Sequence, residues 1–327
     1  MVGYIVKRIL MAIPTLIFVS IVSFTVIQLP PGDFLTSYVT QLEQSGATVD
    51  EDTVLVLKDR YGLDQPVYIQ YLKWVWGMLH GDFGQSFTWN KPVSSLVWDR
   101  LGLTLLISSL TMVFTWLLAF PIGVYSATHQ YSKTDYIATF IGFIGIAIPH
   151  FLLALVLMWL AYAYFGLSVG GLFSSAFLNA PWSFAKFVDM LKHLWVPVVV
   201  IGMGGTAGLI RILRANLLDE VRKPYVVTAR AKGVPERRLL YKYPVRIALI
   251  PFVATVGWSL PALISGETIT AVVLGLPTTG PLLLEALRNQ DMYLAGSFIM
   301  LLSLLTIAGT LISDILLAWL DPRIQYE

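Results

Sequence analysis

The chain has 327 residues, of which 56% are hydrophobic and 13% are charged, and its mean hydropathy is +0.72. Soluble domains carry about 25% charged residues, so these proportions exclude a soluble two-domain protein and predict an integral membrane protein. The net charge of +2 is too small to attract a nucleic acid by itself, and the absence of cysteine excludes disulfides, thiol catalysis and iron–sulfur clusters.

Six charge-free windows predict transmembrane helices, because a span needs about 20 apolar residues. They lie at residues 9–29, 103–127, 136–165, 193–210, 247–266 and 292–313. The first follows Lys7 and Arg8, as a signal peptide would, but its apolar run is too long and no small-residue cleavage site follows it. We therefore predict an all-α integral membrane protein with six transmembrane helices, the first of them retained.

The orientation follows from Lys and Arg, which are retained on the cytoplasmic side. Ten of these residues lie between Arg211 and Arg246. That segment lies between the fourth and fifth of the six spans, so it is in the cytoplasm only if the N-terminus is in the cytoplasm too. We therefore expect both termini in the cytoplasm.

The segment between the first two spans, residues 30–100, is then external. Two short helices are expected in it, at 50–61 and at 66–79, the second with Pro66 in its first turn. Helical spacing gives the second an apolar face made of Tyr68, Tyr71, Leu72, Val75 and Leu79. The region is a cap packed on the membrane domain or a docking surface for an extracytoplasmic partner, and the two are compatible.

The cytoplasmic segment 215–246 predicts two short helices joined by a glycine turn. Pro224 suits the start of a helix that continues through Lys232, Gly233 suits a left-handed stop, and Pro235 begins a second helix. Small residues would leave one face of the first helix open to another protein, namely Thr228, Ala229 and Ala231. The alternative is a basic loop that lies on anionic lipid.

The stretch Tyr225–Gly233, YVVTARAKG, resembles the coupling loop of ABC importer permeases, and most closely that of the B-type permease subunit of oligopeptide/dipeptide importers. Further motifs of that family follow its order along nearly the whole chain: PGD at 31–33, YGLDQP at 61–66, QYLKW at 70–74, GDFGQS at 81–86 and LDPR at 320–323. Val227 stands where many importers carry the glutamate that names this loop.

The resemblance implies a type I ABC importer permease fold with an external helical insertion between helices 1 and 2. Its parts are a first transmembrane helix at 1–29, a periplasmic-side cap at 30–100 and a five-helix core at 101–327 that contains the coupling loop 215–246. It implies a non-catalytic subunit of a prokaryotic inner membrane, forming half of a pathway for peptides. Related importers carry oligosaccharides, nickel or opines.

The implied partners are a second homologous permease, two P-loop ATPases that use ATP and Mg²⁺, and an extracytoplasmic solute-binding protein. Motion of the ATPases would be passed to the pore as alternating access. The chain itself is expected to bind no cofactor and no metal, because it lacks a P-loop and its four histidines lack ligand spacing. Glycines in the fourth span are expected to allow close helix packing, namely Gly202, Gly204, Gly205 and Gly208.

By the same resemblance, the ATPase contact is assigned to Tyr225, Thr228, Ala229, Ala231 and Gly233, flanked by Arg237 and Arg238. The candidates for the solute pathway are Glu267, Trp258, Pro149 and His150. An intramembrane carboxylate usually faces a cavity, whereas an interfacial Glu267 would pair with Arg or cap a helix. Pro149 and His150 interrupt the third span, as a flexible pore-facing point or as packed residues.

Two other functional classes are compatible with parts of the pattern. A stand-alone secondary transporter or channel would use Glu267 and Asp314 as an ion relay, but the two halves show no evident inverted repeat. An intramembrane enzyme needs a reactive constellation, which scattered histidines without any cysteine do not provide.

Overall fold

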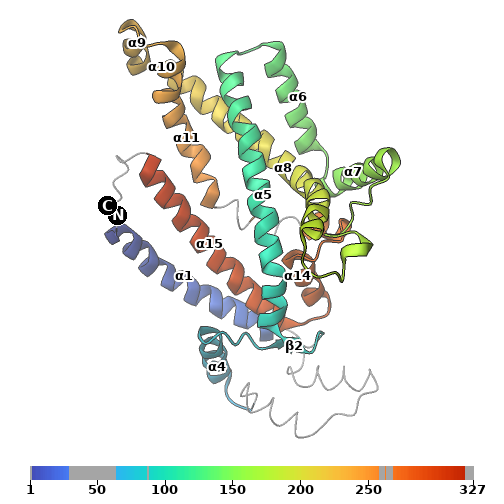
Figure 1. The fold of residues 1–327 in the computed structure, drawn as a ribbon. Helices are drawn as coiled ribbons and strands as arrows, with labels where there is room; N and C mark the ends of the chain where they lie inside the picture. The colour runs from blue at the N-terminus through green and yellow to red at the C-terminus, as the bar shows by residue number, and fades with distance from the viewer. Residues whose placement is uncertain (1, 29–63, 87, 258–261, 263–267, 321–327) are drawn as a thin grey trace. The chain divides into compact units, whose positions relative to one another are not determined.

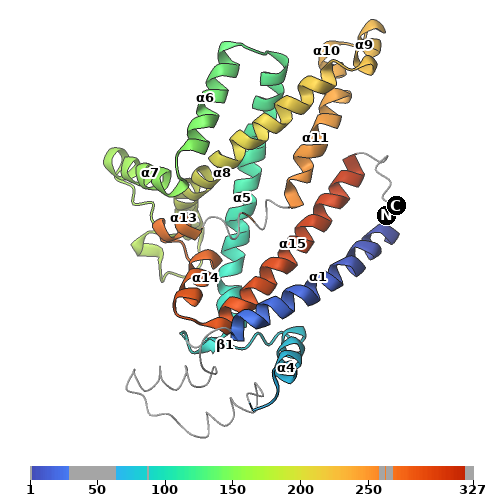
Figure 2. The ribbon, with the colours of Figure 1, turned by 180° about the vertical axis from the view of Figure 1, so that it is seen from behind.

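The structure is a computed structural model that describes residues 2–28, 64–86, 88–257, 262 and 268–320. Helices dominate these residues, as the composition predicts (Figures 1 and 2). The helices are α1 Val2–Gln28, α4 Val67–Leu79, α5 Val93–Thr128, α6 Lys133–Ala147, α7 His150–Phe165, α8 Phe184–Val221, α9 Pro224–Ala231, α10 Glu236–Lys242, α11 Pro244–Ala254, α13 Thr268–Val273, α14 Thr279–Arg288 and α15 Met292–Leu320. Strands β1 Gln85–Ser86 and β2 Lys91–Pro92 and the 3₁₀ helix η1 Ser175–Phe177 complete the described elements.

Four of the described helices are long and apolar enough to cross a membrane, at Val6–Gln28, Val93–Thr128, Phe184–Val221 and Met292–Trp319. The expected third span is broken into α6 and α7, which are bent by 105° and give a fifth span if they count as one. α11 covers the start of the expected span 247–266, most of whose remainder lies outside the described residues. The count of six therefore stays a prediction.

The break between α6 and α7 has a local cause at Pro149. A residue before proline is pushed out of the helical region of backbone space. Ile148 is accordingly extended, with φ −87° and ψ 125°, and Pro149 takes the N-cap position of α7. The sequence identified this interruption but did not predict how sharply the chain turns there.

The chain divides into two compact units, with the division inside α5, α14 and α15. Unit 1 holds residues 1–102 and 282–304, and unit 2 holds residues 103–281 and 305–327. In unit 1, α4 packs on α1, where the Phe24 ring lies 5.5 Å from Tyr71 and 5.7 Å from Trp74 between centroids. The expected helix 66–79 is thus confirmed as α4, which begins one residue later.

The GDFGQS motif of unit 1 is held against the start of α15. The buried Asp291 carboxylate accepts hydrogen bonds from the Ser86 hydroxyl and, at 3.3 Å, from the backbone N–H of Thr88. Gly84 has φ +87°, and a Cβ there would lie 2.7 Å from the ring of Tyr293. Only glycine fits that left-handed, crowded position, which accounts for the glycine in the motif.

In unit 2, α8 is the central helix and packs against α6, α7 and α11 (Figure 2). A Cβ at Gly202 would lie 2.6 Å from the ring of Phe114, and one at Gly204 would collide with the His150 ring. The predicted close packing at glycines is therefore confirmed at these two positions, whereas Gly208 has no atom within 4 Å of such a Cβ.

Candidate functional site

Helices α9 and α10 form a hairpin, residues 224–242, that follows α8 after a two-residue break. Pro224 opens α9, Gly233 has φ +76° in the turn, and Pro235 takes the N-cap position of α10. This is the helix–glycine–helix arrangement that the sequence predicts. The segment 215–246 starts within α8, however, because that helix runs on to Val221.

The α9–α10 hairpin has an apolar core of its own. Val226 is fully buried, Leu239 is 1% exposed and Ala229 is 8% exposed. Tyr225, Val234 and Tyr243 pack around these three residues. Burying a Val or Leu side chain stabilises a fold by about 1.5–3 kcal/mol, so the two helices hold together as one body.

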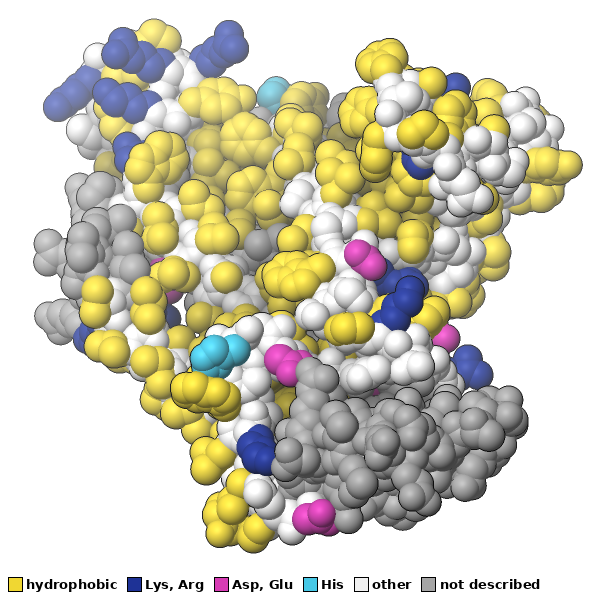
Figure 3. All heavy atoms as spheres, turned by 60° about the horizontal axis from the view of Figure 1, so that its bottom comes forward, with side chains coloured by type: hydrophobic (Ala, Val, Ile, Leu, Met, Phe, Trp, Pro, Cys, Tyr) yellow, Lys and Arg dark blue, Asp and Glu magenta, His cyan; other side chains and the backbone are white. Residues whose placement is uncertain are grey.

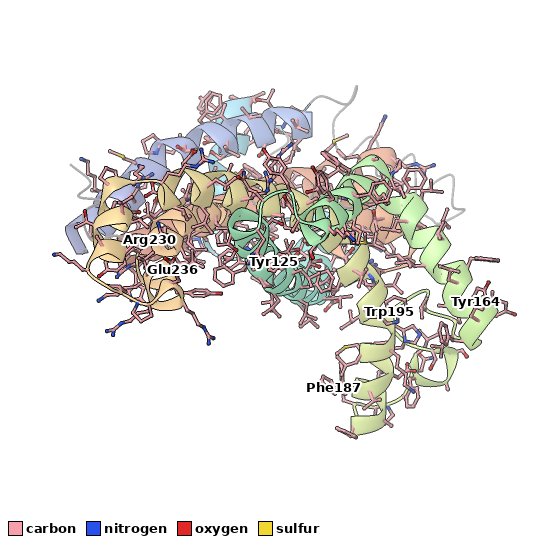
Figure 4. The ribbon with its side chains drawn as sticks, turned by 90° about the horizontal axis from the view of Figure 1, so that it is seen from above. Tyr125, Tyr164, Phe187, Trp195, Arg230 and Glu236 are labelled. Atoms are coloured by element: carbon pink, nitrogen blue, oxygen red, sulfur yellow. The ribbon has the colours of Figure 1, made fainter. Side chains whose placement is uncertain are left out.

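An ion pair joins the two helices across the turn. Arg230 Nε donates to Glu236 Oε1 at 2.5 Å and Arg230 Nη2 donates to Oε2 at 3.2 Å (Figure 4). This hydrogen bonding lowers the pKa of Glu236 and raises the pKa of Arg230. Both side chains are well exposed, so the pair orients the two helices more than it stabilises them.

A hydrogen bond ties α9 back to the end of α8. Tyr225 Oη donates to Glu220 Oε2 at 2.5 Å, and Lys223 Nζ lies 2.9 Å from Glu220 Oε1. Glu220 is only 9% exposed. Burial, together with this hydrogen bond, raises the pKa of Tyr225, which therefore stays a neutral donor at physiological pH. Sequence reasoning missed Glu220. Glu220 and Tyr225 are five positions apart on either side of a helix break, and this spacing matches no helical or strand periodicity.

The outer face of α9 is small and partly apolar. The residues at positions i, i+3, i+4 and i+7 are all exposed, namely Pro224, Val227, Thr228 and Ala231. Ala229 does not share this face, because it is buried in the hairpin core. The expectation that the three small residues lie together holds for Thr228 and Ala231 only.

Basic residues are exposed elsewhere on the hairpin. Arg237 and Arg238 are exposed on α10, and Lys232 is exposed in the turn. Figure 3 shows Lys and Arg side chains gathered at the upper left, over the α9–α10 hairpin. The hairpin thus presents a short, partly apolar helix face together with exposed positive charges.

A second polar link connects α8 with α6. Arg214 Nη2 donates to Asp135 Oδ2 at 3.0 Å, and the Tyr131 backbone N–H donates to the same oxygen at 3.0 Å. Asp135 is 3% exposed, and its own N–H donates to Ser132 at the N-cap of α6. Breaking a buried pair leaves an uncompensated charge, so this contact holds the start of α6 on α8.

The candidate solute-pathway residues are only partly visible. Pro149 lies at the bend between α6 and α7, and the His150 ring packs over Gly204 of α8. Trp258 and Glu267 lie outside the described residues. Within the described residues, no group of three or more His, Asp or Glu side chains is placed to hold a metal ion.

An open groove of about 530 Å³ runs along one side of α5 in unit 2. Its lining is apolar and comes from Met112, Val113, Trp116, Leu117, Phe120 and Pro121. A solute site needs a few convergent polar groups to orient its ligand. This groove has none in its lining, so we do not assign it to the solute.

Comparison with known proteins places the chain among membrane components of transport systems. Residues 119–326 match the family described as "Binding-protein-dependent transport system inner membrane component", and residues 1–109 match the N-terminal family of the same components. The chain is 36% identical to the oligopeptide transport system permease protein AppB of Bacillus subtilis, with all of both chains covered.

Two further relatives extend this similarity. The dipeptide transport system permease protein DppB of Alkalihalophilus pseudofirmus is 29% identical, with all of both chains covered. The inner membrane ABC transporter permease protein YejB of Escherichia coli O157:H7 is also 29% identical, with 99% of both chains covered.

Proposed function

We propose that this chain, which belongs to the family of binding-protein-dependent transport system inner membrane components, carries peptides as half of the solute pathway of an ATP-driven importer. Membership makes the chain a multi-pass membrane permease subunit. The peptide cargo is supported by full-length similarity to relatives named as oligopeptide and dipeptide transport permeases. Oligosaccharides, nickel or opines are the alternative cargoes.

The observation that carries the proposal is the α9–α10 hairpin. Its outer face of Val227, Thr228 and Ala231 is small enough to enter a groove on an ATPase. Gly233 sets the turn, and Arg237 and Arg238 border the contact with positive charge. These residues form the ATPase contact.

Tyr225 and Ala229 have a different part in the same contact. The Tyr225 hydroxyl is engaged by Glu220, and Ala229 packs inside the hairpin. Both residues position α9, and neither side chain forms its outer face.

Motion of the ATPases reaches the pore through α8. The Tyr225–Glu220 hydrogen bond makes α9 move with the end of α8, and the Arg214–Asp135 pair makes α8 carry α6 with it. The two contacts lie on one uninterrupted stretch of α8, from Arg214 to Glu220, so a displacement of its end acts on both. Two such permeases, driven together, alternate between inward- and outward-facing states.

The chain works with four kinds of partner: a homologous permease, P-loop ATPases that use ATP and Mg²⁺, a solute-binding protein and lipid. ATP hydrolysis belongs to the ATPases, of which there are two. The protein lies in the inner membrane with both termini in the cytoplasm, which is supported by the ten basic residues between Arg211 and Arg246. The α9–α10 hairpin is then cytoplasmic, where the ATPases are.

The solute pathway is assigned to Glu267, Trp258, Pro149 and His150. Support comes from the bend at Pro149, which interrupts the backbone beside α8, the helix linked to the α9–α10 hairpin. Glu267 supplies a carboxylate suited to a peptide amine.

Site-directed cross-linking tests the ATPase contact. The chain has no cysteine, so Ala231→Cys on the outer face of α9 is a single reactive site. Thr134→Cys, exposed at the start of α6 in the other expected cytoplasmic loop, is the matched control. We expect Ala231→Cys, and not Thr134→Cys, to cross-link to a co-expressed ATPase in membranes that still take up peptide. Cross-linking from neither position, or equally from both, would contradict the assignment.

A further inference from the structure

Helix α4 carries an exposed apolar stripe, on which the described residues place only the His80 ring, 4.3 Å from the Trp76 ring between centroids. Tyr68, Leu72, Trp76 and Leu79 follow one another at positions i, i+4, i+8 and i+11 and therefore share one face. They are 65%, 60%, 66% and 76% exposed. A stripe of four large apolar side chains on a short helix marks an interaction surface.

The neighbouring face of α4 is packed on α1, and this fixes the depth of α4. Tyr71 Oη lies 2.7 Å from Ser20 Oγ, and the Gln70 and Gln28 side chains hydrogen-bond at 3.1 Å. α1 is a candidate span from Val6 to Gln28. Ser20 lies eight residues before Gln28, which is about 12 Å along the helix axis. The Tyr71 side chain therefore reaches inside the span, while Gln70 keeps α4 beside the Gln28 end of α1.

The remaining side of α4 is polar. Lys73, which is half-buried, lies there, turned away from Tyr68 by more than a third of the helix circumference. α4 thus has a protein-facing side, an apolar stripe and a polar side. This three-way division is typical of a helix in the plane of a membrane interface.

The composition of the stripe fits the same location. Trp76 and Tyr68 have an apolar ring with one polar atom, which suits the boundary between headgroups and acyl chains. Leu72 and Leu79 have no polar atom and suit the acyl side. α1, on which α4 packs, is a candidate span that itself exposes large apolar residues, among them Phe18, Ile21 and Val22. The exposed stripe of α4 therefore adjoins a helix suited to lipid.

We propose that α4 is an interfacial helix whose stripe, Tyr68, Leu72, Trp76 and Leu79, inserts into the bilayer leaflet around the Gln28 end of α1. The occupant of the stripe is membrane lipid. The helix anchors the external segment that follows it at a fixed depth. This inference does not depend on the cargo or on the ATPase contact.

Depth-dependent fluorescence quenching tests the proposal. Leu72→Cys and Leu79→Cys place single labels on the stripe, and Lys73→Cys is the matched control on the polar side of the same helix. Each full chain is labelled with bimane and reconstituted into phosphatidylethanolamine and phosphatidylglycerol vesicles. One set of vesicles contains lipids with a nitroxide near the top of the acyl chain, and the other is exposed to aqueous iodide.

We expect the nitroxide lipids to quench labels at positions 72 and 79 several-fold more than the label at 73, and iodide to show the reverse order. Iodide quenching at 72 and 79 equal to that at 73 would place the stripe in water and overturn the proposal. Labels at 72 and 79 that neither quencher reaches would mean that protein covers the stripe, which overturns it too. Two stripe positions keep the test valid if one variant folds poorly.

Discussion

Removing a single hydroxyl at Tyr225 tests how the α9–α10 hairpin is connected to the membrane helices. Tyr225→Phe keeps the ring in the hairpin core and removes only the donor to Glu220 Oε2, now 2.5 Å away. A hydrogen bond to a charged group contributes about 1.5–3 kcal/mol, and Glu220 is buried, so water replaces the lost donor poorly. Lys223 still pairs with the other oxygen.

The lost hydrogen-bond energy lowers the population of the state in which α9 is held on α8. At 1.4 kcal/mol per tenfold change, the state in which α9 is held on α8 becomes less favoured by a factor of about ten to a hundred. The outer face of α9, the proposed ATPase contact, is unchanged, so we expect the ATPases still to bind. We therefore expect the amount of peptide taken up per ATP hydrolysed to fall while ATPase binding is retained.

The assay is peptide uptake and ATP hydrolysis measured together in vesicles that contain the reconstituted importer. Tyr241→Phe is the matched control, because Tyr241 is half exposed on α10 and should change neither quantity. In a double-mutant cycle, the effects of Tyr225→Phe and Glu220→Gln on the ratio of uptake to hydrolysis should be non-additive, since the two residues share one interaction. An unchanged ratio of uptake to hydrolysis in well-inserted Tyr225→Phe would refute the connection through Glu220.

Three further predictions concern the hairpin itself. Gly233→Val should abolish uptake and ATPase association, because the turn needs φ +76° and a β-branched residue is strained there. Leu239→Ala should destabilise the hairpin by about 2–5 kcal/mol, seen as faster proteolysis of residues 224–242 in membranes. Arg230 lowers the pKa of Glu236, so the pair's contribution is present above the ordinary glutamate pKa and is lost as the pH falls through the lowered value. Limited proteolysis across an acid pH series should show this loss, and Glu236→Gln should reduce the pH dependence to the part that comes from other carboxylates such as Glu220, whose pKa is also lowered.

Each of these has an outcome that would contradict it. Gly233→Asn should keep activity because asparagine tolerates the left-handed region, and equal loss in both Gly233 variants would argue against a conformational cause. Arg238 is exposed, so Arg238→Ala should not speed proteolysis. If Arg238→Ala and Leu239→Ala speed proteolysis equally, burial of Leu239 is not what stabilises the hairpin. A pH profile unchanged by Glu236→Gln would mean that other groups control the hairpin.

The hairpin could be predicted because its signals are local. Pro224 and Pro235 restrict their own backbone and Gly233 permits the left-handed conformation of the turn, so these three residues are sufficient to place two helices and a turn. The direction in which each side chain points is not determined by such local signals. Ala229 is buried because α10 folds back over it, and sequence periodicity on an eight-residue helix does not identify which face is covered.

The long-range contacts could not be predicted from spacing. Arg214 meets Asp135 across 79 residues, and Ser86 meets Asp291 across 205. Such pairs depend on which helices are neighbours, which a single sequence does not encode in any short pattern. The apolar face of the helix at 66–79 was predicted as one surface, whereas the structure separates it into a packed side with Tyr71 and an exposed stripe with Tyr68.

The most direct test of the account is to purify the tagged chain from its native membrane in mild detergent, with ATP hydrolysis blocked, and to identify what accompanies it by mass spectrometry. The account predicts a second permease of the same family and P-loop ATPases, with a solute-binding protein that retains peptide. A chain recovered alone or only as copies of itself, with no ATPase, would contradict the importer assignment and favour a stand-alone transporter.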